Sequence, residues 1–343
     1  MRTRGRLTVL TAVASAAVLA LLSACSPGGT GSPGTGATGA PTQVFNLKMS
    51  TQLADTAPMV TGFREWAKTV EAKTNGGIKI EVFPSAQLGS DEDVIEQAIE
   101  GVNVAVLTDG GRMGNYVPDV GIIGMPYIAN NYDEVKAITD SATFKSWDPK
   151  FAENGIRILA YNWYDGPRNF YTNKEIKAPA DLNGLRVRTP GAPVWAKSVE
   201  ALGATPVAMP WPDSYNALQS KTIDGVEVQS TSAYPASMWE VTKFMTRTEH
   251  FQLANFIMVG EKWINTLPAD YQKILADECK AAAAENAKLV ISTATDYEKK
   301  MADNGIAISD VDKAPFIAAA EKAYTELGYA ALRDQIWSEI GKK

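Results

Sequence analysis

The residues of this chain best suited to chemistry lie between Asp181 and Glu227. Arg188 ends a short run of alternating apolar residues, and Trp211 follows another. An arginine stays charged and presents a planar fork of donors that fits a carboxylate at two points. If Arg188 lines a cleft, the chain binds an organic anion. Arg186, two residues earlier, lies on the same strand face by alternation, so periodicity alone does not choose between the two.

Side chains for catalysis are scarce. The chain has a single histidine, His250, and two cysteines, Cys25 and Cys279. This excludes His-rich and Cys-rich metal sites, and His-dependent triads unless His250 itself serves. There is no P-loop, G-x-S-x-G or H-E-x-x-H motif, and no acid–base pair can be named for His250. We therefore predict a protein that is not an enzyme and that uses neither a metal nor a cofactor.

The N-terminus has the pattern of a lipoprotein signal peptide. A basic start and a short apolar run end in LSAC at Cys25, which matches a bacterial lipobox. We predict that residues 1–24 are removed and that Cys25 is lipidated. Residues 25–42 combine Gly, Ser, Pro and Thr without any charge, and we expect a flexible linker there. The protein is thus expected outside the cytoplasm, anchored by lipid to a membrane.

The charge balance argues against a nucleic-acid partner. Loss of residues 1–24 removes three arginines and leaves 30 basic residues against 39 acidic ones, a formal net charge of −9. No basic footprint for nucleic acid is present. An acidic protein that binds an anion must use a few local cations, so each arginine that lines a cleft is a candidate for anion binding.

Alternating strand and helix patterns predict an α/β fold with a largely parallel sheet. The predicted strands cover residues 45–49, 78–82, 102–107, 156–163, 168–171, 185–188, 205–209 and 225–228. Helices are predicted at 59–73, after Ser90, at 194–202 and at 213–219. Two such segments of similar pattern in 343 residues indicate two lobes with a cleft between them.

Residues 267–304 form the longest helical tract. Pro268 suits a first helical turn, and Gly305 follows the end. The pattern fits two or more consecutive helices, or one kinked helix that crosses both lobes.

Residues 43–340 resemble the DctP-type solute-binding proteins of tripartite ATP-independent periplasmic (TRAP) transporters. The resemblance lies in the order and spacing of five segments: Gly76–Gly101, Gly124–Ile128, Asp165–Arg188, Ala201–Glu227 and Leu267–Leu275. It implies a two-lobe, Venus-flytrap fold of the periplasmic-binding-protein type, with mixed sheets, crossover connections and a long hinge-spanning helix. We predict lobe I from residues 43–165 and 254–293, and lobe II from residues 166–253 and 294–343.

The function that this resemblance implies is an extracytoplasmic receptor, active as a monomer. It would capture a small organic acid in the interlobe cleft: a sugar acid, a hydroxy or keto acid, or a dicarboxylate. It would then deliver the acid to a TRAP permease with a large and a small membrane subunit. Two other functions share parts of the pattern: a receptor for an ATP-driven importer, and a tethered enzyme that uses carboxylates alone.

Three side chains correspond to ligand-binding positions of the family. Arg188, in GLRVR, matches the carboxylate-binding arginine. Arg168, in DGPRNFY, matches a position that contacts the carboxylate or a neighbouring hydroxyl; the alternative is an ion pair with a nearby acid. Trp211 matches an aromatic that lies against the ligand's carbon skeleton; the alternative is a tryptophan in the core of a lobe.

Polar residues at strand ends are further candidates. Asp109 aligns with a position that accepts a ligand hydroxyl or amine, although it could equally cap the turn at Gly110. Ser50, Thr51 and Gln52 close the first strand and are expected as polar contacts.

Val228 departs from the family pattern, because many members carry an asparagine there that bonds the carboxylate. Gln229 or Ser230 could substitute for it. Tyr234 and Asn255 are candidates near the expected hinge and cleft segments.

Overall fold

The computed structural model describes residues 43–342. The predicted signal peptide, the lipidation at Cys25 and the linker therefore lie outside the described residues. Within residues 43–342, no helix combines the length and the apolar character needed to cross a membrane.

A nine-stranded mixed sheet organises the chain, in the order β2-β1-β3-β8-β4-β7-β5-β6, with β9 paired to β8. The strands are β1 (Phe45–Ser50), β2 (Ile78–Phe83), β3 (Val104–Asp109), β4 (Ile156–Thr172), β5 (Arg186–Thr189), β6 (Thr205–Ala208), β7 (Gly225–Gln229), β8 (Phe244–Gly260) and β9 (Ala307–Asp310). The strands β2, β1 and β3 pair in parallel, as do β7, β5 and β6. Between these groups, β8 runs antiparallel to β3 and β4, and β4 runs antiparallel to β7. The pairing of β8 with β9 is parallel. The predicted α/β class with a mixed sheet is confirmed.

Two long strands join the halves of this sheet. β4 and β8 have 17 residues each and pair with one another along most of their length. One end of β8 bonds to β3, whereas the opposite end of the pair bonds to β7 through β4. The sequence predicts two separate strands at 156–163 and 168–171, and this is wrong. The chain stays extended through Gly166, which takes a φ of 100° at a shift in register.

The principal helices cover the sheet and follow their sequence signals. They are α1 (Pro58–Lys73), α2 (Asp91–Glu100), α4 (Tyr132–Asp140), α7 (Pro193–Ala201), α11 (Ala269–Asp303), α12 (Ala314–Glu326) and α13 (Ala330–Ile340). Short helices are α3 (Gly110–Met113), α5 (Ala142–Lys145), α6 (Asp148–Glu153), α8 (Ser214–Gln219), α9 (Ser230–Ala233) and α10 (Glu261–Ile264). Single 3-10 turns are η1 (Pro118–Gly124), η2 (Pro179–Leu182), η3 (Trp211–Asp213) and η4 (Met238–Glu240). Ser90 caps α2 in a capping box with Asp93, as the sequence predicts.

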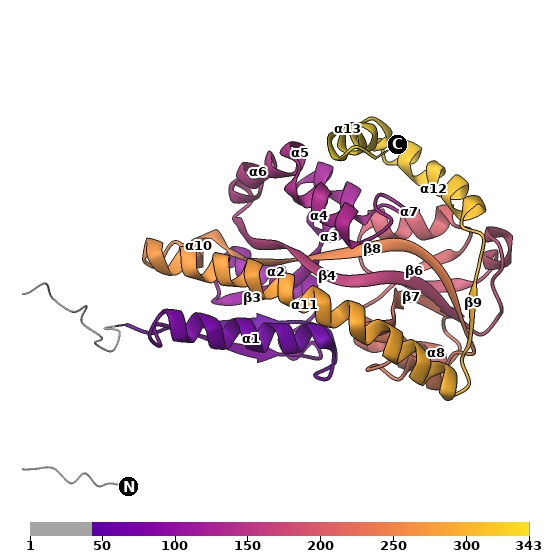
Figure 1. Cartoon of the computed structure of the whole chain (residues 1–343), viewed down its shortest axis with the longest axis horizontal. Coiled ribbons are helices and arrows are strands. Elements are labelled where there is room, and N and C mark those ends of the chain that lie inside the picture. Colours follow the sequence, from indigo (N-terminus) through magenta and orange to yellow (C-terminus); the bar gives the residue numbers. More distant parts are fainter. Residues whose placement is uncertain (1–42, 343) are drawn as a thin grey trace, which may run out of the picture. The chain divides into compact units, whose positions relative to one another are not determined.

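Helix α11 is one element of 35 residues, so the alternative of two or more consecutive helices is wrong. It packs on β4 and α1 and also contacts α9 and β9 in the other half of the sheet. Figure 1 shows it running diagonally past the sheet, beside α1 and on towards α8. The predicted lobe boundaries fall inside β4, β8 and α11. They stay a prediction, in which these three elements form the hinge.

Candidate functional site

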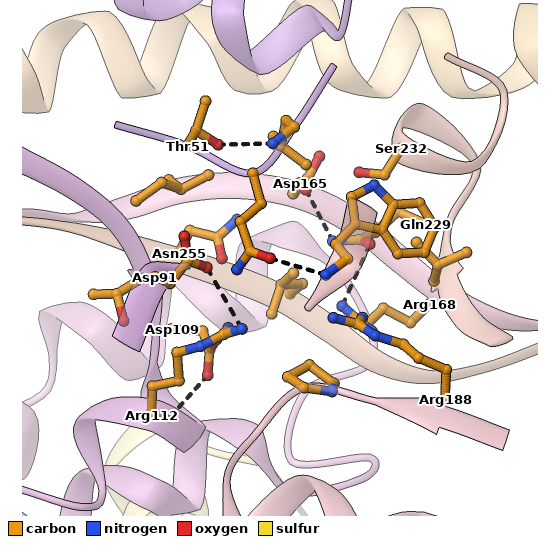
Figure 2. Close-up of a pocket in the computed structure, with 18 residues that line it drawn as sticks. Thr51, Asp91, Asp109, Arg112, Asp165, Arg168, Arg188, Gln229, Ser232 and Asn255 are labelled. Carbon is orange, nitrogen blue, oxygen red and sulfur yellow. Dashed lines mark hydrogen bonds and ion pairs between the residues drawn. The ribbon is translucent and has the colours of Figure 1, made fainter. Parts of the chain in front are cut away.

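A polar cavity of about 70 Å³ lies where the two halves of the sheet meet (Figure 2). The residues that line it are Thr51, Gln52, Leu53, Asp91, Leu107, Thr108, Asp109, Arg112, Asp165, Arg168, Arg188, Pro190, Trp211, Val228, Gln229, Ser232, Leu253 and Asn255. The loop after β1, the start of α2, the end of β3 and α3 supply one side, and β4, β5, β7 and β8 supply most of the other. On the same measure one water takes about 10–15 Å³, so the cavity suits a small polar molecule.

Arg188 is the arginine of the cavity lining that forms no ion pair with a carboxylate of the described residues. It lies on β5 and is 3% exposed. Its Nε donates to the Met209 carbonyl at 3.0 Å, and its guanidinium carbon lies 5.4 Å from the centre of the Trp211 ring. No carboxylate of residues 43–342 forms an ion pair with it. Burial and the neighbouring positive charge of Arg168 lower the pKa of Arg188 to about 9.

Arg186, the alternative that periodicity left open, has a different environment. Its side chain is 45% exposed and pairs with Asp224 at 2.9 Å. It is absent from the cavity lining. Burial therefore selects Arg188 as the anion-binding candidate, as the family motif predicts.

Arg168 lines the same cavity but already has an acid. Its Nε and Nη2 bind the two carboxylate oxygens of Glu227 at 2.5 and 2.6 Å. Burial alone would raise the pKa of Glu227, yet the charge of Arg168 and the His250 ring, whose Nε2 lies 3.5 Å from the carboxylate, hold it below its usual value. Arg168 thus forms the ion pair that was the alternative, and it also lines the cavity; its contact with a ligand stays a prediction. Only its Nη1, 3.4 Å from the Gln229 amide oxygen, remains for a further partner.

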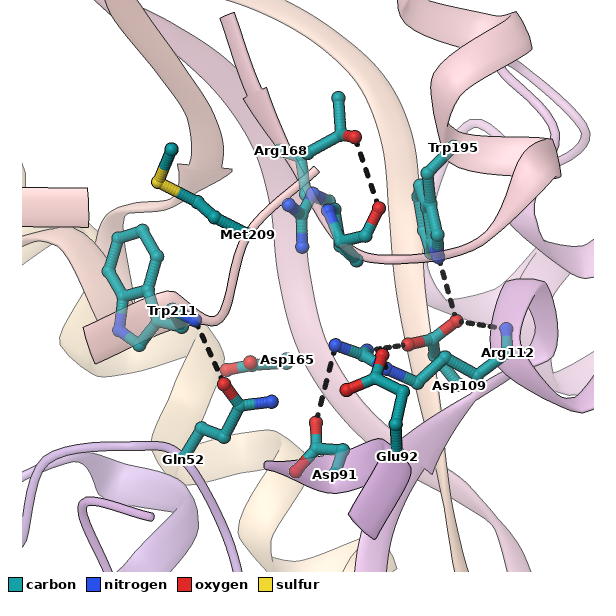
Figure 3. Close-up of polar contacts among 12 residues, drawn as sticks. Gln52, Asp91, Glu92, Asp109, Arg112, Asp165, Arg168, Trp195, Met209 and Trp211 are labelled. Carbon is teal, nitrogen blue, oxygen red and sulfur yellow. Dashed lines mark hydrogen bonds and ion pairs between the residues drawn. The ribbon is translucent and has the colours of Figure 1, made fainter. Parts of the chain in front are cut away.

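Arg112, at the opposite side of the cavity, holds a cluster of acids (Figure 3). It pairs with Asp109, with Glu92 at 2.7 Å and with Asp91 at 3.5 Å. Asp109 also accepts the backbone N–H of Arg112 at 3.0 Å, so it caps α3 and lines the cavity at once. Sequence reasoning missed Arg112 and Asp91, because their pairing is set by tertiary contacts between α2, β3 and α3.

Asp165 is a second residue that sequence reasoning passed over, although it begins the DGPRNFY motif. Its carboxylate accepts hydrogen bonds from the Gln229 amide at 2.9 Å and from the Thr231 hydroxyl at 3.1 Å. Burial raises the pKa of Asp165 to about 7, against the lowering effects of Thr231, Arg168 and Ser232. Gln229, a predicted site residue, thus lines the cavity and orients this acid.

Two hydrogen bonds join opposite sides of the cavity (Figure 3). The backbone N–H of Trp211 donates to the side-chain oxygen of Gln52 at 2.8 Å. The indole N–H of Trp195, on α7, donates to Asp109 at 2.9 Å. The described conformation therefore brings the β1 and β3 loops against elements of the other half.

The remaining candidates divide into two groups. Trp211, Val228 and Asn255 line the cavity. Trp211 also packs into an apolar cluster, which was the alternative, and its contact with a ligand stays a prediction. Ser50 and Tyr234 do not line it. Ser50 is buried at the end of β1, beside Thr51 and Gln52, which do. Tyr234 instead packs against Tyr297 in a tilted arrangement, with ring centres 4.6 Å apart.

His250 packs in the interior, among aromatic and polar side chains. It is fully buried, stacks on Phe170 at 4.6 Å and contacts the Thr248 hydroxyl at 2.7 Å. Across residues 43–342, no three His, Cys, Asp or Glu side chains come together as ligands for a metal ion.

Comparison with known proteins gives a family match over most of the chain. Residues 49–330 match the profile of the bacterial extracellular solute-binding proteins, family 7 (DctP). The C4-dicarboxylate-binding periplasmic protein DctP of Rhodobacter capsulatus is 27% identical, over 86% of this chain and 87% of its own.

Two solved structures are similar in fold and sequence. A TRAP periplasmic solute-binding protein from Ochrobacterium anthropi, with bound L-fuconate, has a TM-score of 0.84 and 32% identity, covering 87% of this chain and 99% of its own. A second, from Actinobacillus succinogenes with bound L-galactonate, has a TM-score of 0.84 and 27% identity, over 86% and 99% of the two chains.

Proposed function

The chain belongs to family 7 of the bacterial extracellular solute-binding proteins, the TRAP receptors of the DctP type, and from this premise we propose that it captures a sugar acid with one carboxylate. It delivers this ligand to a TRAP permease of a large and a small membrane subunit. It works as a monomer, anchored through the lipid on Cys25, and returns its ligand chemically unchanged.

The observation that carries this proposal is the unpaired guanidinium of Arg188. A buried charge without a partner is costly, and a ligand carboxylate removes that cost by a two-point, charge-assisted pair. The Nε of Arg188 is already fixed on Met209, so its two terminal nitrogens are the donors that remain. The Trp211 ring beside them excludes water and offers an apolar surface to the carbon skeleton.

The charge count within the cavity favours one carboxylate on the ligand. Arg168 and Arg112 are both held by acids, so neither has a full fork to offer a second carboxylate. Around them stand hydrogen-bonding groups that suit hydroxyls: the side chains of Gln52, Asp91, Asp109, Asp165, Gln229 and Asn255. A polyhydroxy monocarboxylate satisfies both halves of this arrangement, which supports a sugar acid over a dicarboxylate. Similar receptors with bound L-fuconate and L-galactonate support the same choice.

A thermal-shift screen of the purified chain tests this proposal. The panel compares aldonates, hydroxy and keto acids, and four-carbon dicarboxylates at equal concentration. A ligand at 100 times its Kd stabilises the native state by about 2.7 kcal/mol. We expect the largest rise in melting temperature with an aldonate. A larger rise with a dicarboxylate contradicts the ligand class, and no rise with any organic acid contradicts the receptor function.

A further inference from the structure

Asp165 is the acidic counterpart of Arg188. It lines the same cavity, is 3% exposed and forms no ion pair with a lysine or arginine of the described chain. The remaining acids of the cavity differ, because Asp91 and Asp109 are both paired with Arg112. The cavity therefore contains one unpaired cation and one unpaired acid.

The carboxylate of Asp165 is fixed in place with acceptor capacity to spare. The Gln229 amide binds Oδ2 at 2.9 Å, and the Thr231 hydroxyl binds Oδ1 at 3.1 Å. A carboxylate has about four acceptor sites, so about two remain. Figure 2 shows Asp165 on a different side of the cavity from the Arg112 cluster, with Gln229 between it and the arginines Arg168 and Arg188.

An unpartnered hydroxyl of the cavity points to the same kind of ligand group. The hydroxyl oxygen of Thr108, which lines the cavity, is buried and has no hydrogen-bond partner within residues 43–342. Buried polar groups are nearly always hydrogen-bonded, so this hydroxyl requires a small polar partner, which a ligand hydroxyl supplies.

We propose that Asp165 is a specificity-determining residue: its carboxylate accepts hydrogen bonds from ligand hydroxyls, and its charge disfavours a ligand with a second carboxylate. This inference rests on the proposed function, in which Arg188 holds the single ligand carboxylate. A second carboxylate near Asp165 would either stand beside a like charge or force Asp165 to take up a proton. With a pKa of about 7 for Asp165, that uptake weakens binding about tenfold at pH 8. Hydroxyls at the same place add no charge and use the free acceptor sites.

The variant Asp165→Asn tests the inference, because it keeps the shape of the side chain and removes the charge. The probes are L-galactonate and galactarate, which differ by a second carboxylate at the far end of the chain. Titration calorimetry of the full chain at pH 8, one unit above the Asp165 pKa of about 7, should show wild type preferring L-galactonate by about tenfold. In Asp165→Asn this preference should disappear, mainly because galactarate binds better. An unchanged preference overturns the inference.

Two further variants separate charge from position. Asp270→Asn removes an exposed acid at the start of α11 and should leave both affinities unchanged. Asp165→Glu keeps the charge but moves the carboxylate by one methylene, so galactarate should stay disfavoured while L-galactonate binds several-fold more weakly. If Asp165→Glu admits galactarate as readily as Asp165→Asn does, the charge is not the cause, and the inference fails.

Two outcomes separate a failure of the proposed function from a failure of the inference about Asp165. If wild type binds neither probe, the proposed ligand class fails, and the inference fails with it. If wild type binds L-galactonate with the expected preference but Asp165→Asn leaves it intact, only the inference fails. An analogue of L-galactonate with a terminal amine that binds wild type more tightly than L-galactonate overturns the assignment of hydroxyls, because Asp165 would then pair with an ammonium group.

Discussion

Replacing Arg188 by glutamine should stabilise the protein in the absence of ligand. The difference between an ordinary arginine pKa of 12.5 and the value of about 9 in the cavity corresponds to about 5 kcal/mol, at about 1.4 kcal/mol per pKa unit. The variant loses the hydrogen bond to Met209 and the contact with Trp211, which together offset about 2–3 kcal/mol. A net gain of about 2 kcal/mol remains, or a few degrees in melting temperature for a chain of this size.

Arg168→Gln provides the matched control, because it removes the same group from a paired site. Loss of Arg168 leaves Glu227 buried without its cation, which costs about 3–5 kcal/mol. Differential scanning fluorimetry of both variants without ligand should therefore give shifts of opposite sign. If Arg188→Gln is destabilised as much as Arg168→Gln, Arg188 is an ordinary structural arginine, and the reasoning that assigns it to a ligand is refuted.

Two further predictions concern stability. Asp165→Asn should raise the melting temperature at pH 8, and this gain should disappear as the pH falls towards 4. The folded-state pKa of Asp165, about 7, exceeds the ordinary value of 3.8. Wild type therefore loses up to about 4 kcal/mol of stability as the pH rises from 3.8 to 7, whereas the variant does not. An equal gain at pH 8 and at pH 5 would contradict this prediction. Gly260→Ala should cost more than about 3 kcal/mol in urea unfolding, since its Cβ would lie 1.8 Å from the Ala98 carbonyl oxygen. The matched change Gly191→Ala, whose Cβ would meet only the flexible end of Glu92 at 3.2 Å, should cost little, and similar losses in both variants would argue against the close contact at Gly260.

Local sequence patterns predicted the helices α1, α2, α7, α8 and α11 and the short strands β1, β2, β3, β5, β6 and β7, because each of these elements carries its own periodicity and end signals. They missed the helices α4, α12 and α13 and the strand β9. They failed for β4 and β8. The Gly166-Pro167 pair is typical of the end of a strand, yet β4 continues through it with a shift in register. In β8, buried Thr246, Thr248 and His250 interrupt the apolar pattern. Strands that lie in the middle of a sheet gain their hydrogen bonds from distant segments, and a local window does not contain that information.

The site could be predicted only in part for the same reason. Motif position identified Arg188, and burial supports it over Arg186. Sequence reasoning gave no role to Arg112 or to Asp165, although Asp165 begins the DGPRNFY motif, because their roles depend on which charges the fold pairs and which it leaves unpaired. The sequence predicts both Arg188 and Arg168 as site residues. Only the structure shows that Arg168 is paired with Glu227 and that Arg188 is unpaired.

The most direct test of the central claim is titration calorimetry of wild type and Arg188→Lys with the best ligand of the thermal-shift screen. Lysine keeps the charge but loses the planar fork and the second donor to a carboxylate. We predict that affinity falls by at least about 100-fold, consistent with the loss of a charge-assisted, two-point pair in a buried site. An affinity equal to that of wild type would contradict the claim that Arg188 holds the ligand's carboxylate.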